Sequence, residues 1–484
     1  MTKTIAIIGA GPVGLAAGAY AIERGMTPII LEQGPDIGHA VRQWEHVPMF
    51  SNWVYDIDSA AGRLLEATGW NRPDPEAYPT GADLLSQYLK PLATRTPLKD
   101  AIYLNSTVRS VARRGVDKVK SAGRADEPFE LVVRNGTGEK RITADAVIDA
   151  SGTWFAPNPG GSGGIAALGE TEAAARIHHG MPDVLGKDRA RYAGRTVAVL
   201  GGGHSAIGTL IELAKLADIE PRTRITWLYR GSVIAKAFGG GNADQLSARG
   251  ALGTTIARLI REERIVVKTG FHLSGVEQTD DGLVLSSGSG CGCAKVAVGE
   301  LIIATGFRPD LSFLRELRIE LDPALECPPV LAPLIDPNLH SCGTVRPHGA
   351  AELRHPEPGF YIAGMKSYGR APTFLLATGH EQVRSIMAEI AGDHAAARWV
   401  ELVLPETGVC AGPGPKVTGS ADTNAGCCGG PAKDDASACC LEDEVTKASG
   451  ETGCGCGASV PVPLSVPNAT CGTPFRESEN ALAR

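Results

Sequence analysis

The sequence predicts an α/β fold, because one local pattern opens two separate parts of the chain. A buried strand, a helix and a second strand are expected, in that order, at residues 4–9, 13–25 and 27–32. The same series is expected again at residues 195–200, 205–217 and 223–230. A glycine-rich turn joins the first strand to the helix in both series. Two such openings, about 190 residues apart, predict two Rossmann-like dinucleotide-binding domains rather than one.

Shorter apolar segments are expected to complete these two domains. Leu131–Val133 and Ala146–Ala150 predict sheet strands of the first domain. Glu300–Gly306 and Phe360–Gly364 predict strands that close the second domain and return the chain to the first. From Pro405 onward, small, polar and cysteine residues follow one another without a helical or strand period. Such a composition buries too little apolar surface to offset the entropy of ordering, so a disordered tail is predicted.

The composition excludes some classes of partner. Of the 484 residues, 43% are apolar, and 47 basic residues stand against 54 acidic ones for a formal net charge of −7. Nucleic acids and anionic membranes both require a basic patch, so neither is expected as a partner. The apolar segment 5–22 is interrupted by Gly9, Gly11, Pro12, Gly14 and Gly18. We therefore expect neither a signal peptide nor a membrane span, and a cytoplasmic protein.

The first glycine-rich turn has the spacing of a dinucleotide-binding site. Gly9, Gly11 and Gly14 stand between a predicted strand and a predicted helix. The first glycine permits a tight turn, the second lets the backbone approach a pyrophosphate, and the third lets the helix pack closely on the strand. Glu32 stands at the end of the second strand, where a carboxylate can accept hydrogen bonds from a ribose diol. Together these residues predict a bound dinucleotide.

The second turn has the same spacing, but its second strand ends differently. Gly201, Gly203, Ser205 and Ala206 occupy the turn and the start of the following helix. Arg230 ends the second strand, where a ribose-binding acid would otherwise be expected. An arginine pairs with a 2′-phosphate that a carboxylate would repel, so the sequence favours NADPH over NADH at this turn. The alternative is that Arg230 is only a solvated charge.

The order of the motifs resembles one group of flavoproteins. Five features, in their order along the chain, are similar to those of the flavin-containing and Baeyer–Villiger monooxygenase group. They are the first turn, the acid Glu32, a strand that ends in Asp149-Ala150-Ser151-Gly152-Thr153, the second turn, and the segment 304–310 (Ala-Thr-Gly-Phe-Arg-Pro-Asp). The resemblance covers residues 1–395 and implies FAD at the first turn and NADPH at the second. It also implies cofactor contacts from Arg42, Gln43, Trp44, Val108, Ser151, Gly152, Gly364, Met365, Thr305 and Gly306.

Two departures separate the chain from the best-known members of that group. Met365 stands where relatives have an aspartate after a glycine, and methionine cannot accept the hydrogen bond that this aspartate accepts from the flavin. The FxGxxxHxxx(Y/W) signature is also missing, and the corresponding segment 155–182 offers only His178 and His179. We therefore do not expect the oxidation of ketones or amines by default.

The resemblance and the two turns together predict three parts of the chain. An FAD-binding domain is expected at residues 1–158 and 322–399, with an NADPH-binding domain inserted at residues 190–310. A cysteine-rich tail is expected at residues 405–484, and eight of the 12 cysteines lie there.

The positions of the cysteines bear on the reaction. Disulfide reductases with two such domains need a close thiol pair beside the flavin. This chain has no cysteine before Cys291, and Cys291 and Cys293 belong to a predicted hairpin of the second domain. Molecular oxygen is the other acceptor to which a reduced flavin can pass its electrons.

The tail carries three close pairs of thiols. In a reducing compartment, clustered thiols more often bind soft metals or metalloids than form disulfides, and adjacent cysteines rarely pair with each other. The tail resembles those of flavoproteins encoded beside arsenic-resistance genes, and the alternative is a linker of no fixed role. The expected metal ligands are Cys427, Cys428, Cys439, Cys440, Cys454 and Cys456.

Candidates for the chemistry itself lie near the returning strand. Cys342 and His348 precede that strand and Lys366 follows it, so all three are candidate catalytic residues. For Cys342 a role as a small core residue is an equal alternative. The resemblance also implies that a helix over residues 374–390 points its N-terminus at the flavin.

Three functions remain open from the sequence. The first is an NADPH-dependent flavin monooxygenase that uses molecular oxygen on a small molecule with a soft nucleophilic centre, with trivalent arsenic preferred. The second is a metal or thiol reductase whose tail cysteines carry electrons from reduced FAD to an outside acceptor. The third is a metalloid-binding chaperone with vestigial flavin domains. Oxygen consumption coupled to NADPH oxidation separates the first function from the others.

Overall fold

The computed structural model describes residues 2–238, 247–288, 294–338, 345–372 and 374–402, all within one compact unit, Met1–Ala421. The predicted tail with its six candidate metal ligands, the candidate Cys342, and Cys291 and Cys293 lie outside the described residues.

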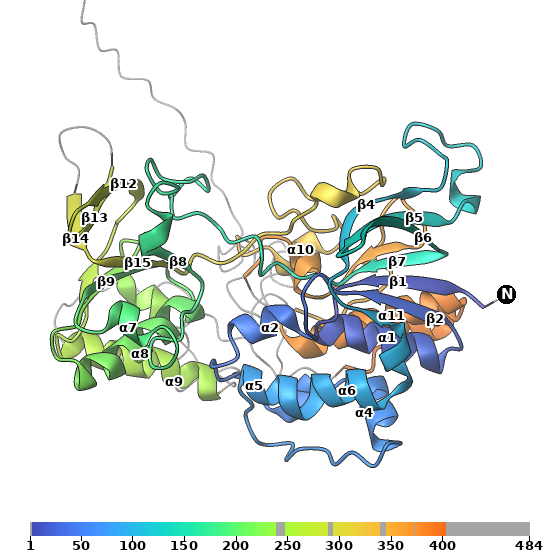
Figure 1. The fold of residues 1–484 in the computed structure, drawn as a ribbon, viewed down its shortest axis with the longest axis horizontal. Coiled ribbons are helices and arrows are strands. Elements are labelled where there is room, and N and C mark those ends of the chain that lie inside the picture. The colour runs from blue at the N-terminus through green and yellow to red at the C-terminus, as the bar shows by residue number, and fades with distance from the viewer. Residues whose placement is uncertain (1, 239–246, 289–293, 339–344, 373, 403–484) are drawn as a thin grey trace, which may run out of the picture. The chain divides into compact units, whose positions relative to one another are not determined.

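The first domain is built on a parallel five-stranded sheet (Figure 1). Its order is β16-β7-β1-β2-β3, and every neighbouring pair of strands is parallel. Because β7 pairs with β1 and β16 pairs with β7, the carboxyl ends of segments far apart in the sequence meet at one edge of the sheet. The strands are β1 (Thr4–Ile8), β2 (Thr27–Leu31), β3 (Ile102–Tyr103), β7 (Ala146–Asp149) and β16 (Phe360–Ile362).

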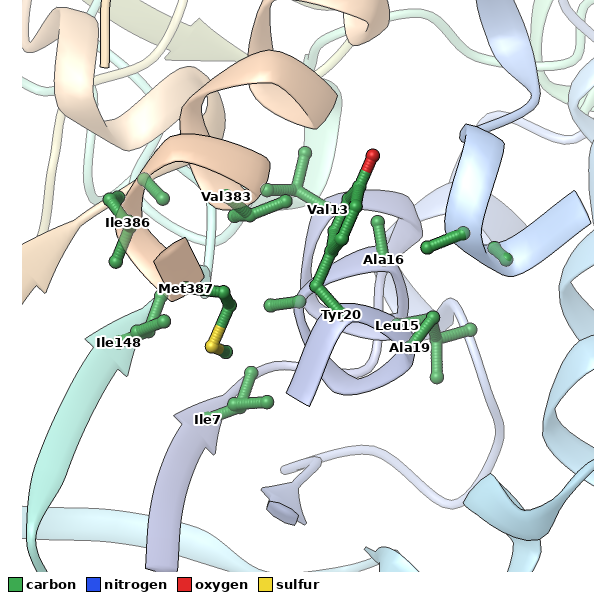
Figure 2. Close-up of a cluster of buried hydrophobic side chains, with 14 of the residues drawn as sticks. Ile7, Val13, Leu15, Ala16, Ala19, Tyr20, Ile148, Val383, Ile386 and Met387 are labelled. Carbon is green, nitrogen blue, oxygen red and sulfur yellow. The ribbon is translucent and has the colours of Figure 1, made fainter. Parts of the chain in front are cut away.

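Strand β1 is buried on both faces, as its uninterrupted apolar sequence predicts. Ile7 faces a cluster formed with helices α1 (Pro12–Glu23) and α11 (Leu376–Ala391), and Figure 2 shows Met387 of α11 pointing toward Ile7 and Ile148 of the paired strands β1 and β7. Ile8 faces the opposite cluster, which an antiparallel sheet supplies.

That antiparallel sheet contains one of the strands predicted for the first domain. Leu131–Val133 does form a strand, within β5 (Phe129–Asn135), but β5 pairs with β4 (Thr107–Arg113) and β6 (Gly138–Ala144) and not with the parallel strands. Burial alternates along β5, which is typical of a strand that covers a core with only one of its faces. This alternation distinguishes β5 from β1, which is buried on both faces.

The second domain repeats the plan of the first. Its parallel sheet has the order β11-β10-β9-β15-β8, helices α8 and α9 pack against it, and a second antiparallel sheet has the order β12-β13-β14 (Figure 1). The elements are β8 (Ile177–His179), β9 (Thr196–Leu200), α8 (His204–Ile219), β10 (Arg224–Leu228), α9 (Ser247–Arg261), β11 (Val266–Lys268), β12 (Leu273–Thr279), β13 (Gly282–Ser287), β14 (Ala294–Val298) and β15 (Glu300–Ile303).

Both predicted openings are confirmed, with element ends that differ from the predicted ones by at most two residues. The predicted returns are confirmed as well, since β15 lies in the second sheet and β16 in the first. No helix among the described residues has the length and apolar character that crossing a membrane requires.

Short helical segments complete the described chain: α2 (His39–Gln43), α3 (Trp53–Asp56), α4 (Ser59–Glu66), α5 (Gly81–Asp83), η1 (Leu84–Leu89), α6 (Lys90–Arg95), η2 (Pro97–Ala101), η3 (Arg124–Asp126), η4 (Ala174–Arg176), α7 (Arg189–Tyr192), η5 (Ile234–Phe238), η7 (Ser312–Leu314), α10 (Ala332–Ile335), η8 (Gly364–Tyr368) and α12 (His394–Arg398).

Candidate active site

The first turn has the backbone that its glycines predict. Gly9 has a φ of +102°, a conformation that favours glycine. A Cβ on Gly14 would lie 2.0 Å from the carbonyl oxygen of Gly9, so the turn tolerates no side chain there. A Cβ on Gly11 would have no atom of the described residues within 4 Å, apart from its chain neighbours. The turn is therefore closed at Gly14 and open at Gly11, which fits a pyrophosphate at the N-terminus of α1.

Glu32 is buried and helps to build this turn. Its Oε2 accepts a hydrogen bond from the Ala10 N–H and its Oε1 one from the Gly34 N–H, both over 2.8 Å. Each carboxylate oxygen has a further lone pair, so Glu32 can hold the turn and still accept bonds from a ribose diol.

The segment after β7 packs directly against the first turn. A Cβ on Gly9 would lie 3.0 Å from the Cα of Ser151. Asp149 Oδ1 accepts hydrogen bonds from the Ser151 N–H over 3.1 Å and from its hydroxyl over 2.6 Å. Gly152 follows with a φ of +69°. Ser151 and Gly152 are thus brought beside the phosphate-binding turn.

Lys366 lies behind that segment. Its Nζ is 2.6 Å from Asp149 Oδ2 and 3.1 Å from Ser151 Oγ, and the side chains of Lys366 and Asp149 are both 0% exposed. The Nζ also lies 4.5 Å from the centre of the Phe313 ring. The lysine therefore faces the core, and a catalytic role for it stays a prediction.

His348 is buried in a chain of hydrogen bonds centred on Gln382. The Gln382 amide accepts a bond from the Gly364 N–H over 2.8 Å, and its Nε2 lies 2.9 Å from both His348 Nε2 and Ser367 Oγ. His348 Nδ1 lies 3.1 Å from the Arg346 carbonyl oxygen. Only a neutral ring that carries its proton on Nδ1 satisfies both contacts. Burial lowers the pKa of His348 in agreement with this state.

The starts of helices α1 and α11 meet beside Gly364. Gly364 has a φ of +72°, and a Cβ on it would lie 3.3 Å from Val13 Cγ2. A Cβ on Gly379 would lie 2.6 Å from the same methyl group. Met365, between Gly364 and Lys366, is half-buried.

The remaining residues expected at the FAD site differ from one another in how far they are exposed. Arg42 is exposed, with its Nε 3.4 Å from Asp36 and its NH1 3.5 Å from Glu45. Gln43 is exposed and Trp44 is half-buried. Val108 is buried in the cluster beneath the antiparallel sheet, so only its backbone could reach a nucleotide. These positions leave their contacts with FAD as predictions.

The second turn repeats the construction of the first. Gly201 has a φ of +144°, and a Cβ on it would lie 2.3 Å from the Ala304 carbonyl oxygen. The Trp227 indole N–H donates to the Gly201 carbonyl oxygen over 2.7 Å. Ala206 replaces the third glycine, with its Cβ 3.4 Å from where a Cβ on Gly201 would lie. A Cβ on Gly203 would meet no atom of the described chain within 4 Å except its neighbours, so this turn is open where the first one is.

Arg230 is exposed at the end of β10. Its NH1 donates to the Ser162 carbonyl oxygen over 3.3 Å, and a guanidinium carries further N–H donors besides this one. Ser205, in the first turn of α8, is half-buried. The chain thus holds a cation near the second turn, as a 2′-phosphate requires.

The two connections between the domains pair with each other. The Asn158 N–H donates to the Gly306 carbonyl oxygen over 2.9 Å, and the Asn158 side chain donates to the Thr305 carbonyl oxygen over 3.0 Å. The rings of Trp154 and Phe307 stack with centres 4.7 Å apart. Thr305 and Gly306 of the returning connection therefore contact Asn158 of the outgoing one.

Sequence reasoning missed Asp149, Asn158, Phe313 and Gln382. Asp149 was the one with a signal, because it stands in the quoted strand-end motif, whereas no local pattern marks the others. His178 and His179 lie in β8, at the edge of the second sheet, and burial lowers the pKa of His178 to about 4.

Comparisons with known proteins agree with this architecture. Flavin-containing monooxygenase 1 of Mus musculus is 29% identical over 225 residues, which are 45% of this chain and 39% of that protein. The chain thus spans about two fifths of that relative. Two solved structures share the fold, each with a TM-score of 0.58. The bacillithiol disulfide reductase of Bacillus cereus is 20% identical, and the match covers 81% of this chain and 99% of that one. The FAD-bound cadaverine monooxygenase of Erwinia amylovora is 14% identical, and the match covers 84% of this chain and 98% of that one.

A family match covers more of the chain than the curated relative does. Residues 6–330 match the family described as pyridine nucleotide-disulphide oxidoreductase. FAD and NADPH are the cofactors, in agreement with two turns that each leave space for a pyrophosphate. The chain therefore belongs to the pyridine nucleotide-disulphide oxidoreductase family, and it is an FAD- and NADPH-dependent oxidoreductase.

Proposed function

We propose that this protein is an NADPH-dependent flavin monooxygenase that oxidises a small molecule with a soft nucleophilic centre. The placement of the cysteines carries the proposal. A disulfide reductase needs a thiol pair beside its flavin, but the chain has no cysteine before Cys291. The one cysteine of the described residues is Cys327, which is buried, and burial raises the pKa of its thiol to about 12. Such a thiol stays protonated near neutral pH and is a poor nucleophile.

The two turns divide the cofactors between them. FAD is assigned to the first turn, because Gly11 is open there and Glu32 lies at the end of β2. NADPH is assigned to the second turn, because Gly203 is open and Arg230 lies at the end of β10. This assignment gives Ser151 and Gly364 places beside FAD, at the carboxyl edge of the first sheet.

The overall reaction balances with molecular oxygen as the second substrate. NADPH, a proton, oxygen and the reduced substrate give NADP⁺, water and a substrate that carries one additional oxygen atom. Bound FAD supplies the redox chemistry that activates oxygen. The chain's residues bind and orient the cofactors, and the neutral imidazole of His348 is assigned to holding Gln382 and the Gly364 backbone in place.

Trivalent arsenic, inorganic or methylated, is the first substrate to test. It offers a lone pair to an activated oxygen atom and binds thiols strongly, which the predicted tail supplies through Cys427, Cys428, Cys439, Cys440, Cys454 and Cys456. The relatives named flavin-containing monooxygenase support the type of reaction and not this substrate.

The test follows NADPH oxidation, oxygen consumption and product mass together. The full-length holoenzyme is supplied with trivalent arsenicals in water equilibrated with ¹⁸O-labelled oxygen, and an organic amine and a ketone serve as comparison substrates. We expect arsenical-dependent consumption of NADPH and oxygen in equal amounts, with one labelled atom in the product. NADPH oxidation that reduces an external disulfide or metal ion at the same rate without oxygen would contradict the proposal and favour a reductase.

A further inference from the structure

We propose that Lys366 is a positioning residue, which anchors both connections between the nucleotide-binding domains to the end of strand β16 and thereby sets the geometry for hydride transfer from NADPH to FAD. The proposal holds for any final substrate, because it concerns only the transfer between the two cofactors.

The outgoing connection is held through Asp149 and Ser151. The Lys366 Nζ contacts Asp149 Oδ2 over 2.6 Å and Ser151 Oγ over 3.1 Å, and Asp149 Oδ1 accepts both hydrogen bonds of Ser151. The chain then leaves the first sheet through Gly152 and Trp154 toward Asn158. A single buried amine therefore fixes the first residues of this connection.

The returning connection is held by the same amine. Phe313 lies in η7, shortly after Phe307, and the centre of its ring is 4.5 Å from the Lys366 Nζ. A cation over an aromatic face is attracted by the ring, more strongly when both are removed from water. Because Trp154 and Phe307 also stack on each other, the two connections share two points of attachment.

The burial of the pair favours positioning over proton transfer. The side chains of Lys366 and Asp149 are both 0% exposed, so neither offers a face to a substrate. Removing one member of a buried pair leaves an uncompensated charge, whereas replacing both with neutral groups is often tolerated. The pair can therefore be tested with a double variant in which no charge remains.

The experiment compares K366M, the double variant D149N/K366M and R384M. Arg384 also forms a buried pair, with Glu381, and holds the 396–399 segment instead of the connections, so R384M is the matched control for losing a buried cation. The first readout is amide hydrogen exchange of residues 151–158 and 305–314 in the apoprotein. The second is the rate of flavin reduction by saturating NADPH without oxygen, together with the Kd of NADPH.

We expect faster exchange of both connections in K366M, by about tenfold or more, and unchanged exchange there in R384M. Flavin reduction should slow by about tenfold or more with the Kd of NADPH within about twofold, because small displacements of reacting groups have large effects on rate. D149N/K366M should restore folding stability but not the reduction rate. If K366M does not fold, F313L tests the same anchor, with faster exchange at 305–314 expected.

Three outcomes would overturn the proposal. Unchanged exchange and reduction rate in K366M, with only a lower Tm, would make the pair a stability element. A reduction rate restored by the double variant would show that removing the unpaired charge is sufficient. A variant whose loss of rate disappears at high pH would point to proton transfer by the lysine.

Discussion

The Gln382 side chain donates a hydrogen bond to the Nε2 of His348 over 2.9 Å, although 34 residues separate them in the sequence. The same amide accepts the Gly364 N–H, so the imidazole is connected to the backbone at the end of β16. Since the Nδ1–H of His348 faces the Arg346 carbonyl oxygen, protonating the ring would leave a second N–H pointing at the donor Nε2 of Gln382.

This contact predicts a loss of stability in acid. Burial holds the pKa of His348 below its ordinary 6.5, so as the pH falls through 6.5 the unfolded chain takes up a proton that the folded chain does not. The free energy of unfolding should therefore fall below pH 6.5, and H348Q should remove part of that fall. Urea unfolding at pH 7.5 and 5.5 measures this change in the free energy of unfolding, and H394Q, at an exposed histidine, is the control. An equal fall in wild type and H348Q would contradict the prediction.

Two alanine substitutions in the first turn should separate folding from cofactor binding. G14A places a methyl group 2.0 Å from a backbone oxygen, so the apoprotein should lose about 1–3 kcal/mol or more of stability. G11A meets no described atom outside its chain neighbours, so its apoprotein should unfold normally while its affinity for FAD falls. Thermal unfolding of the apoproteins and fluorescence titration with FAD distinguish the two effects. Normal affinity for FAD in G11A would remove the first turn from the FAD site.

Arg230 should select for the 2′-phosphate. R230A should raise the KM for NADPH by about ten- to a hundredfold, since a charge-assisted contact contributes about 1.5–3 kcal/mol, and leave the KM for NADH nearly unchanged. R224A is the matched control, because Arg224 begins strand β10 whereas Arg230 follows the other end of that strand by two residues. Steady-state kinetics with both nucleotides make the comparison. Equal effects of R230A on the two nucleotides would show that Arg230 does not contact the phosphate.

Asp56 should destabilise the protein at high pH. Its side chain is buried, the Ser51 hydroxyl donates to its Oδ1 over 2.7 Å, and its Oδ2 has no partner in the described part of the chain. Burial raises its pKa from 3.8 to about 7, so stability is lost as the pH rises from about 4 to 7. D56N should therefore stabilise the protein at pH 8 by up to about 4 kcal/mol and change little at pH 4. Denaturant unfolding at both pH values tests this, with the exposed E172Q as control.

The tail should concentrate the substrate and take no part in turnover. In the full-length chain, serine at the six candidate ligands should leave FAD content and maximal rate nearly intact, lower the rate at low arsenical concentration and abolish stoichiometric metalloid binding. Steady-state kinetics over a range of arsenical concentrations measure both the rate at low substrate and the rate at saturating substrate. A loss of rate at saturating substrate would mean that the tail cysteines carry electrons. The six residues are Cys427, Cys428, Cys439, Cys440, Cys454 and Cys456.

The sequence by itself determined the two turns and the elements around them. Three of the turn glycines meet a local requirement, because Gly9 and Gly201 have a positive φ and a Cβ on Gly14 would lie 2.0 Å from the Gly9 carbonyl oxygen. Strand β1 was equally local, since an uninterrupted apolar run is buried on both faces of a parallel sheet. The separate sheet of β5 required knowledge of its partners, which a single strand does not encode.

Only the tertiary structure decided which side chains meet behind the turns. Lys366 and Asp149 are 217 residues apart, and they meet because β16 and β7 are neighbours in the order β16-β7-β1. Gln382 meets His348 and Gly364 because α11 packs beside α1 on that sheet. Neither contact leaves a periodic trace in the sequence, since a buried polar group is chosen to satisfy distant partners and not its neighbours along the chain.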